Sequence, residues 1–118
     1  MAVPADKLTL LIQQASTASG VSVFGSANGF AEWLKVNRSQ LTRGQQGQRM
    51  RGEPAWRAVG LAAVVAALLQ FLEPEVVPDW LQGTNAHLNH QRPVDLLRDG
   101  HVAAVMAAVE AERAGSFA

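Results

Sequence analysis

The chain has 118 residues and a mass of 12.6 kDa, with ten basic and ten acidic residues and 48% hydrophobic residues. A chain of this length can bury about two-thirds of the surface that it exposes when unfolded, enough for one domain or two very small ones. The absence of cysteine excludes disulfides, cysteine-ligated zinc, iron–sulfur clusters and thiol nucleophiles. The first residues lack the pattern of a secretory signal, so we expect a cytoplasmic protein.

Charge is divided unevenly along the chain. Residues 1–57 carry seven basic and three acidic side chains, whereas residues 58–118 carry three basic and seven acidic ones. A basic half suits a polyanion such as DNA, and an acidic half suits a basic protein surface. We therefore expect the two halves to face different partners.

Short helices joined by loops are predicted for the start of the chain. Apolar residues at helical spacing predict a helix over residues 8–15, and the Ser/Thr/Gly-rich stretch 16–29 is expected to be a loop. Within that loop, residues 21–24 are expected to pack against a helix rather than pair as a strand. A second helix should begin at Asn28 as its cap and bury Phe30, Ala31 and Leu34.

A basic segment follows, and its pattern is typical of a helix-turn-helix. Residues 36–37 are expected to form the turn and residues 38–46 the second helix, whose N-terminal part would enter the major groove of DNA. Side chains that bind phosphates and base edges are concentrated here. The expected DNA-binding residues are Arg38, Ser39, Gln40, Arg43, Arg49 and Arg51. The alternative interpretation is a solvated surface that contacts only protein.

The most apolar stretch of the chain, residues 58–72, predicts a long helix that begins at Pro54 and ends near Leu72. This stretch is shorter than the roughly 20 residues needed to cross a bilayer, so we expect no membrane partner. A helix that is apolar all round must be covered on all sides, which favours burial in a homodimer interface. We place the boundary between two domains here, giving residues 1–54 and 55–118.

The C-terminal half predicts three more helices, and with them an all-α fold. Pro74 and Pro78 end the apolar helix, and residues 80–100 are expected to contain a short helix, a loop and a second short helix from Pro93. The last helix should cover residues 102–114, with Gly115 as a left-handed C-terminal cap before a short tail.

Metal binding and catalysis find little support in the sequence. His87 and His90 are three residues apart and His101 lies further on, but no third metal ligand stands at a usual spacing from the pair. No phosphate loop or nucleophile elbow is present. We expect no metal, no cofactor and no catalysis.

A motif in the C-terminal half is the most specific feature of the sequence. It consists of Trp80-Leu81, Asn85 with Leu88, Arg92-Pro93 with Leu96-Leu97, and Gly100 before the last helix. The motif resembles the toxin-binding domain of the Xre/MbcA/ParS antitoxin family, and the segment FAEWLKVNRSQLTR resembles the Xre-type helix-turn-helix that precedes it. We expect the apolar motif residues to form a core, and Asn85 and Arg92 to tie the loop to the backbone.

The resemblance implies a type II antitoxin without catalytic activity. Its partner would be a RES-domain toxin that degrades NAD, whose active site the antitoxin blocks sterically, and the two would assemble as a hetero-oligomer that contains an antitoxin homodimer. The complex would also repress its own operon by binding operator DNA. The implied toxin-binding residues lie on the last helix and tail: Met106, Val109, Glu110, Arg113, Gly115, Ser116, Phe117 and Ala118. Acidic residues such as Glu110 would attract the basic rim of the toxin and so speed the association of the two proteins.

Two other classes of protein remain as alternatives. The first is a stand-alone helix-turn-helix repressor that acts without a toxin. The second is a small helical scaffold or a metal-dependent enzyme that uses His87 and His90.

Overall fold

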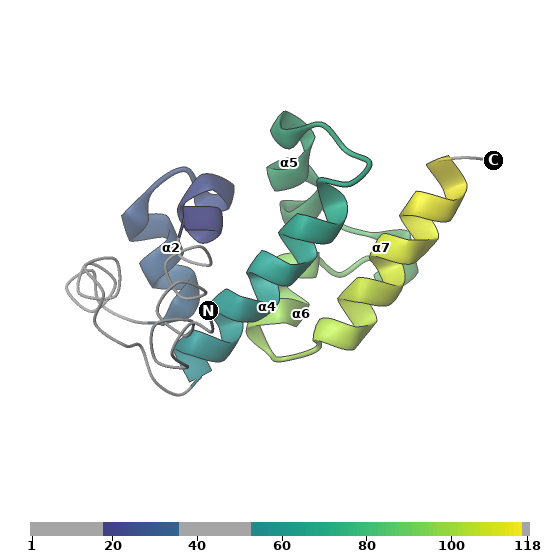
Figure 1. The fold of residues 1–118 in the computed structure, drawn as a ribbon. Coiled ribbons are helices and arrows are strands. Elements are labelled where there is room, and N and C mark those ends of the chain that lie inside the picture. The colour runs from purple at the N-terminus through teal and green to yellow at the C-terminus, as the bar shows by residue number, and fades with distance from the viewer. Residues whose placement is uncertain (1–17, 36–52, 117–118) are drawn as a thin grey trace, which may run out of the picture. The chain divides into compact units, whose positions relative to one another are not determined.

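The structure is a computed structural model that describes residues 18–35 and 53–116. Every regular element within these ranges is helical, so the expected all-α fold is confirmed (Figure 1). The chain divides into two compact units, Met1–Ala62 and Ala63–Ala118, and the division falls inside helix α4 (Glu53–Leu68). The predicted domain boundary at residues 54 and 55 stays a prediction.

Helical structure in the first unit begins earlier than the sequence indicates. Residues 18–24 are helical rather than part of a loop, and Gly25 ends this helix with a φ of 76°. Packing explains the difference, because Val23 is buried and the Phe24 ring stacks on that of Phe30, with ring centroids 6.1 Å apart. Tertiary contacts therefore outweigh the poor helix propensity of Ser19, Gly20 and Ser22.

Helix α2 (Ala27–Leu34) carries most of the core of the first unit. Its N-cap is Ser26 and not Asn28, because the Ser26 hydroxyl accepts a hydrogen bond from the backbone N–H of Gly29 at 3.0 Å. The buried side chains on α2 are Phe30, Ala31, Trp33 and Leu34, which confirms the three that the sequence predicted. The ring centroid of Trp33 lies 5.4 Å from that of Phe24, which completes an aromatic cluster.

A hydrogen bond links α2 to α4 within the first unit. The guanidinium of Arg57 donates to the carbonyl oxygen of Leu34 at 3.1 Å. This carbonyl lies in the last turn of α2, where backbone acceptors lack partners inside the helix.

Helix α4 has 16 residues and ends at Leu68, four residues before the predicted end. Hydrogen bonding continues to Leu72, but the N–H groups of Gln70 and Phe71 bond to carbonyls only three residues back. Along the helix, Ala58, Leu61, Val64, Val65 and Leu68 are buried. The opposite side is apolar and exposed, with Trp56 exposed by 76%.

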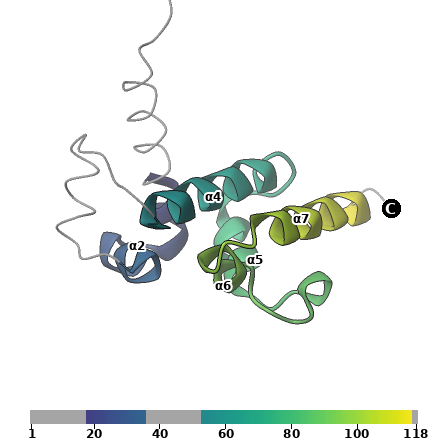
Figure 2. The same cartoon turned by 90° about the horizontal axis from the view of Figure 1, so that it is seen from below.

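The second unit contains the three helices that the sequence predicts, α5 (Val77–Gln82), α6 (Pro93–Arg98) and α7 (Val102–Ser116). It also contains two 3-10 helices that the sequence does not predict, η1 (Pro74–Val76) and η2 (Ala86–Leu88). Helix α6 packs against α5 and α7 (Figure 2), and η2 contacts α7 as well. Motif residues Leu81, Leu88, Pro93 and Leu97 are buried in this unit, whereas Trp80 and Leu96 are half-buried. The core role expected for the apolar motif residues thus holds best for the leucines at 81, 88 and 97.

The end of α7 differs from the prediction. Gly115 lies within the helix instead of forming a left-handed cap, and the helix continues through Ser116. Among the described residues of the second unit, the glycine with a positive φ is Gly100, at 89°, which follows the C-cap of α6 and precedes α7. The expected first helix at residues 8–15 and the second helix of the helix-turn-helix, at 38–46, lie outside the described residues.

The search for a membrane-spanning helix covered the described residues and found none with sufficient length and apolar character.

Gly20 provides a test of the aromatic packing in the first unit. A Cβ atom at Gly20 would overlap the ring of Phe30, so we expect Gly20→Ala to destabilise the protein by about 1–3 kcal/mol. The usual gain in helix propensity from Gly to Ala would have the opposite sign. Urea unfolding followed by tryptophan fluorescence measures the difference. Ser22→Ala, on an exposed position of the same helix, should change stability by less than about 0.5 kcal/mol.

Candidate interaction surface

Helix α7 has one buried side and one side lined by small residues. Val105, Ala108 and Val109 are buried in the second unit. The exposed residues include Ala103, Ala107, Glu110 and Ala114, whose spacing of four, three and four residues places them on one face of the helix. We call these four residues the α7 face. Three alanines give it a low profile that lets another chain approach the helix closely.

The structure changes the set of residues on α7 that a partner can reach. Val109 is only 1% exposed and belongs to the core of its own unit, so a partner cannot reach most of its side chain, and its role in toxin binding stays a prediction. Met106 is half-buried, and Glu110, Arg113 and Gly115 are exposed. The alanines of the α7 face carry no charge or hydrogen-bonding group, so the sequence offered no direct signal for them beyond their helical spacing.

Large exposed apolar side chains occur on other elements. Among the described residues they are Trp56, Val59, Leu69 and Val76. None of these four residues lies on α7. The described part of that helix instead exposes alanines, so close backbone approach rather than a large apolar anchor is what α7 can offer.

The charges on α7 are paired. The Arg113 guanidinium lies 2.8 Å from a carboxylate oxygen of Glu110 and donates two hydrogen bonds to that oxygen. These hydrogen bonds raise the pKa of Arg113 above its usual value. Because Glu110 is neutralised locally, it contributes less to long-range steering of a basic partner than an isolated carboxylate would.

Asn85 organises the loop between α5 and α6. Its side-chain oxygen accepts a hydrogen bond from the N–H of His87 at 2.9 Å, which caps η2. Its carbonyl accepts from the N–H groups of Leu88 and His90, and its own N–H donates to the carbonyl of Gln91 at 3.1 Å. The prediction that Asn85 ties this loop to the backbone is confirmed. We call residues 85–91 the Asn85 loop.

Two adjacent residues of the Asn85 loop adopt the left-handed conformation. Asn89 has a φ of 55° and His90 a φ of 64°, and both side chains are exposed. Left-handed backbone at residues other than glycine costs about 1–3 kcal/mol each, with Asn and His among the better-tolerated types. The loop therefore contains local strain next to a buried anchor, Leu88.

Arg92 differs from the prediction, because its side chain bonds to another side chain and not to the backbone. Its guanidinium donates two hydrogen bonds of 3.0 Å to the carboxylate of Asp95, one turn into α6. The hydrogen bond from Arg92 lowers the pKa of Asp95 below its usual value. The Arg92–Asp95 pair stabilises the first turn of α6, where the ring of Pro93 is buried at the first helical position.

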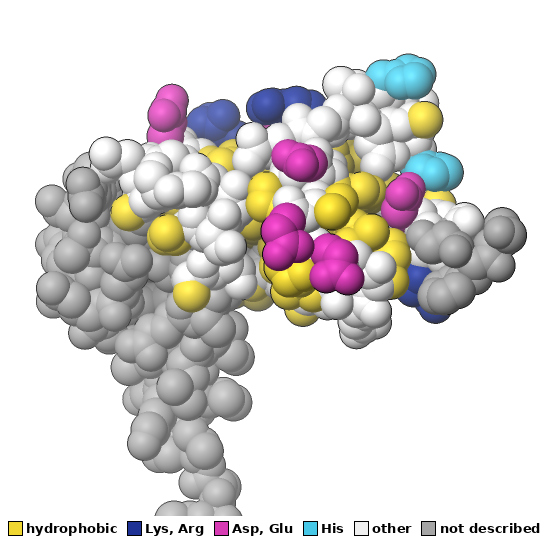
Figure 3. Space-filling view, turned by 90° about the horizontal axis from the view of Figure 1, so that it is seen from above, with side chains coloured by type: hydrophobic (Ala, Val, Ile, Leu, Met, Phe, Trp, Pro, Cys, Tyr) yellow, Lys and Arg dark blue, Asp and Glu magenta, His cyan; other side chains and the backbone are white. Residues whose placement is uncertain are grey.

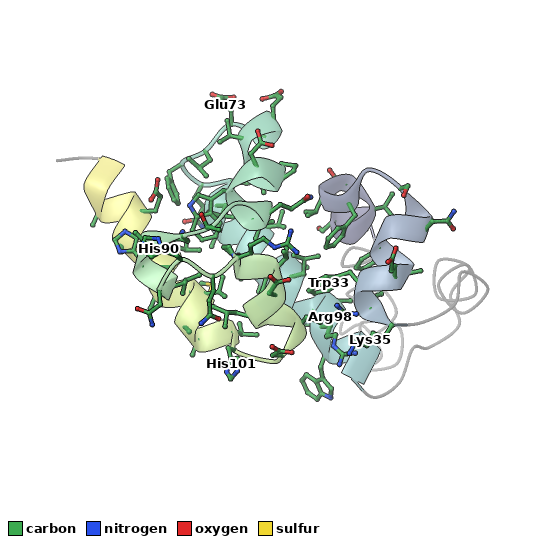
Figure 4. All side chains as sticks on the ribbon, turned by 180° about the vertical axis from the view of Figure 1, so that it is seen from behind. Trp33, Lys35, Glu73, His90, Arg98 and His101 are labelled. Carbon is green, nitrogen blue, oxygen red and sulfur yellow. The ribbon has the colours of Figure 1, made fainter. Side chains whose placement is uncertain are left out.

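The histidines do not converge on a site. His90 lies on the Asn85 loop and His101 precedes α7, at separate places in the second unit (Figure 4). Over the described ranges, no group of three or more His, Cys, Asp or Glu side chains could hold a metal ion.

Several predicted site residues cannot be placed. The DNA-binding set from Arg38 to Arg51 falls in residues 36–52, and Phe117 and Ala118 follow the last described residue, so all of them lie outside the described part of the chain.

Comparison with known proteins defines the class of the fold first. No protein-family model matches the chain. Its fold is similar to that of a chain in the crystal structure of the M. tuberculosis MbcT–MbcA toxin–antitoxin complex, with a TM-score of 0.71 and 24% sequence identity. The similarity covers 89% of this chain and 96% of that chain, so the two chains share a fold.

Sequence comparison then identifies the particular relatives. Over 61 residues the chain is homologous to the mycobacterial cidal antitoxin MbcA of Mycobacterium bovis and of Mycobacterium tuberculosis, with 36% identity. The match covers 52% of this chain and 54% of each relative, so the chain spans about half the length of the curated relatives it matches. The resemblance to this antitoxin family that the C-terminal motif indicates is confirmed.

Asn85→Ala provides a test of the loop. Loss of the cap on η2 should destabilise the second unit by about 0.5–2 kcal/mol and increase amide exchange at His87 and His90. Native-state hydrogen exchange measures both effects. Asn28→Ala, at an exposed position in α2, is the matched control and should leave these amides unchanged. Equal exchange in the two variants would show that the Asn85 side chain does not hold the loop.

Proposed function

We propose that the chain is the antitoxin of a type II toxin–antitoxin pair and that it neutralises a RES-domain toxin that degrades NAD. The homology to MbcA over 61 residues is the observation that carries this proposal, and the fold similarity to a chain of the MbcT–MbcA complex supports it. The chain itself would catalyse nothing. Inhibition would be steric, with the antitoxin covering the mouth of the toxin's active site in the cytoplasm.

The α7 face is the surface that we propose for toxin docking. Its alanines allow close approach over more than two helical turns, and the Glu110–Arg113 pair at its C-terminal part offers a donor and an acceptor without net charge. Helix α7 carries the end of the described chain away from α6 (Figure 1). The residues beyond Ala114, from Gly115 to Ala118, would then enter the active site, where Phe117 could fill an apolar niche and the terminal carboxylate could meet an arginine.

Two further partners belong to this proposal. A second copy of the chain would pack on the exposed apolar side of α4, and the exposure of Trp56 and Val59 supports such an interface. Operator DNA would bind the basic residues from Arg38 to Arg51, which would let the complex repress its own operon.

A bulky substitution on the α7 face should reduce toxin binding without unfolding the chain. Ala107 is exposed in the middle of the face, and Arg is a good helix former, so Ala107→Arg should keep the fold but hold the two chains apart. We expect at least a tenfold rise in Kd for the purified toxin by titration calorimetry. Ser22→Arg, exposed in the first unit, adds the same side chain and should bind as the original chain does. Wild-type affinity for Ala107→Arg would exclude the α7 face from the interface.

Truncation separates docking from active-site blocking. A chain that ends at Ala114 lacks Gly115, Ser116, Phe117 and Ala118 but retains most of α7. It should still bind the toxin yet inhibit its NAD degradation at least tenfold less well, because the active site would remain open. Inhibition assays and binding titrations on the same samples measure the two effects. Full inhibition by the truncated chain would contradict the role of the tail while leaving docking intact.

A further inference from the structure

We infer that the Asn85 loop is a second contact element for the same toxin, with Asn89 and His90 as the side chains that it presents. The inference rests on the proposed function and adds to it two residues that are not among the toxin-binding residues implied by the resemblance. It is carried by the pairing of strained backbone with exposed side chains in a loop that packs against α7.

The backbone of Asn89 and His90 is strained. Glycine adopts a φ of 55° or 64° without penalty, and in this loop both positions carry larger side chains. Neither side chain is buried, so neither contributes to the core of the unit. Strain that does not serve packing is typical of binding and active sites, where a side chain is kept for its contacts with a partner.

Hydrogen bonds and a buried anchor make the Asn85 loop rigid. Residues 85–91 are closed on themselves by four backbone hydrogen bonds of 2.9–3.1 Å and by the Asn85 cap, and Leu88 anchors them in the core. Asn89 and His90 are therefore held in place before a partner arrives. Preorganised side chains lose less conformational entropy on binding than mobile ones do, which strengthens each contact that they make.

The position of the loop determines its partner. Helix η2 packs against α7, and Figure 4 shows His90 beside that helix. Figure 2 shows the segment between α5 and α6 as a long loop that contains a short helical turn. A chain that docks along α7 meets a helix on which η2 also packs, and the polar amide and imidazole groups of the Asn85 loop suit the rim of a protein–protein interface.

The charge of the second unit excludes nucleic acid as the favoured partner. Residues 63–118 carry seven acidic and three basic side chains, and Figure 3 shows acidic side chains on the surface with histidines at its edge. Two of the three basic residues, Arg92 and Arg113, are in ion pairs with carboxylates of the same unit. A polyanion would be repelled here, whereas a protein with polar or basic groups around its docking site would not.

A strain-releasing variant tests the inference. In the double variant Asn89→Gly/His90→Gly the loop keeps its backbone conformation and loses both side chains. We expect the Tm to stay the same or to rise by about 4 °C or more, and the Kd for the purified RES-domain toxin encoded beside this chain to rise at least fivefold. Differential scanning calorimetry and titration calorimetry on the full-length chain measure the two quantities.

Lys35→Gly is the matched control. Lys35 also has a left-handed conformation, with a φ of 61° at the C-cap of α2, but it belongs to the first unit. The same relief of strain should therefore leave toxin affinity within twofold of the original. This comparison separates the effect of lost side chains in the Asn85 loop from any general effect of added glycine.

Each outcome is decisive. Equal or higher Tm with at least fivefold weaker binding supports the inference. A lower Tm would show that the side chains serve the fold, and a smaller change in Kd would show that they do not face the toxin, and either result overturns the inference. If the unmodified chain does not bind this toxin at all, the proposed function fails, which is a different result from failure of the loop variant alone.

Discussion

The hydrogen bonds of Asn85 determine how the second unit presents its surface. A single residue caps η2 with its side chain, accepts from two N–H groups with its carbonyl and bridges to Gln91 with its own N–H. Between α5 and α6 there is little else to fix the chain apart from the burial of Leu88. Because η2 packs on α7, the conformation around Asn85 also sets what packs against this helix. Asn85 thus has a structural role, and it influences the residues that pack next to its loop.

The two units offer different kinds of surface. The α7 face combines alanines with one neutralised ion pair, so toxin binding at this proposed surface would depend on close fit and only weakly on ionic strength. The basic segment of the first half has excess positive charge, and any phosphate contacts that it makes would weaken steeply with salt. If the chain binds both proposed partners, raising the salt concentration would release DNA before it releases the toxin.

The sequence predicted much of the second unit because its signals are local. Pro93 at a helix start and the leucines at 81, 88 and 97 work through spacing and rotamer preference, and the structure agrees with them. Residues 18–24 were mispredicted because their helix depends on Phe24 packing against aromatic rings later in the chain. Helix propensity is a property of single residues, so it contains no information on such a contact.

The candidate surface was less predictable than the fold. Val109 and Met106 share the apolar stripe of α7, and only the packing of the unit decides that the first is buried and the second half-buried. The left-handed backbone of Asn89 and His90 has no signature in composition, since both residue types are common in ordinary polar loops. In the same way, the sequence does not show which alanines of a helix are exposed.

The hydrogen bond from Arg57 to Leu34 has a consequence for how this chain can vary. It fastens together two points of the first unit that are 23 residues apart in sequence, on either side of residues 36–52. Variation at Arg57 would therefore act on both helices at once, because this side chain ties the last turn of α2 to the start of α4.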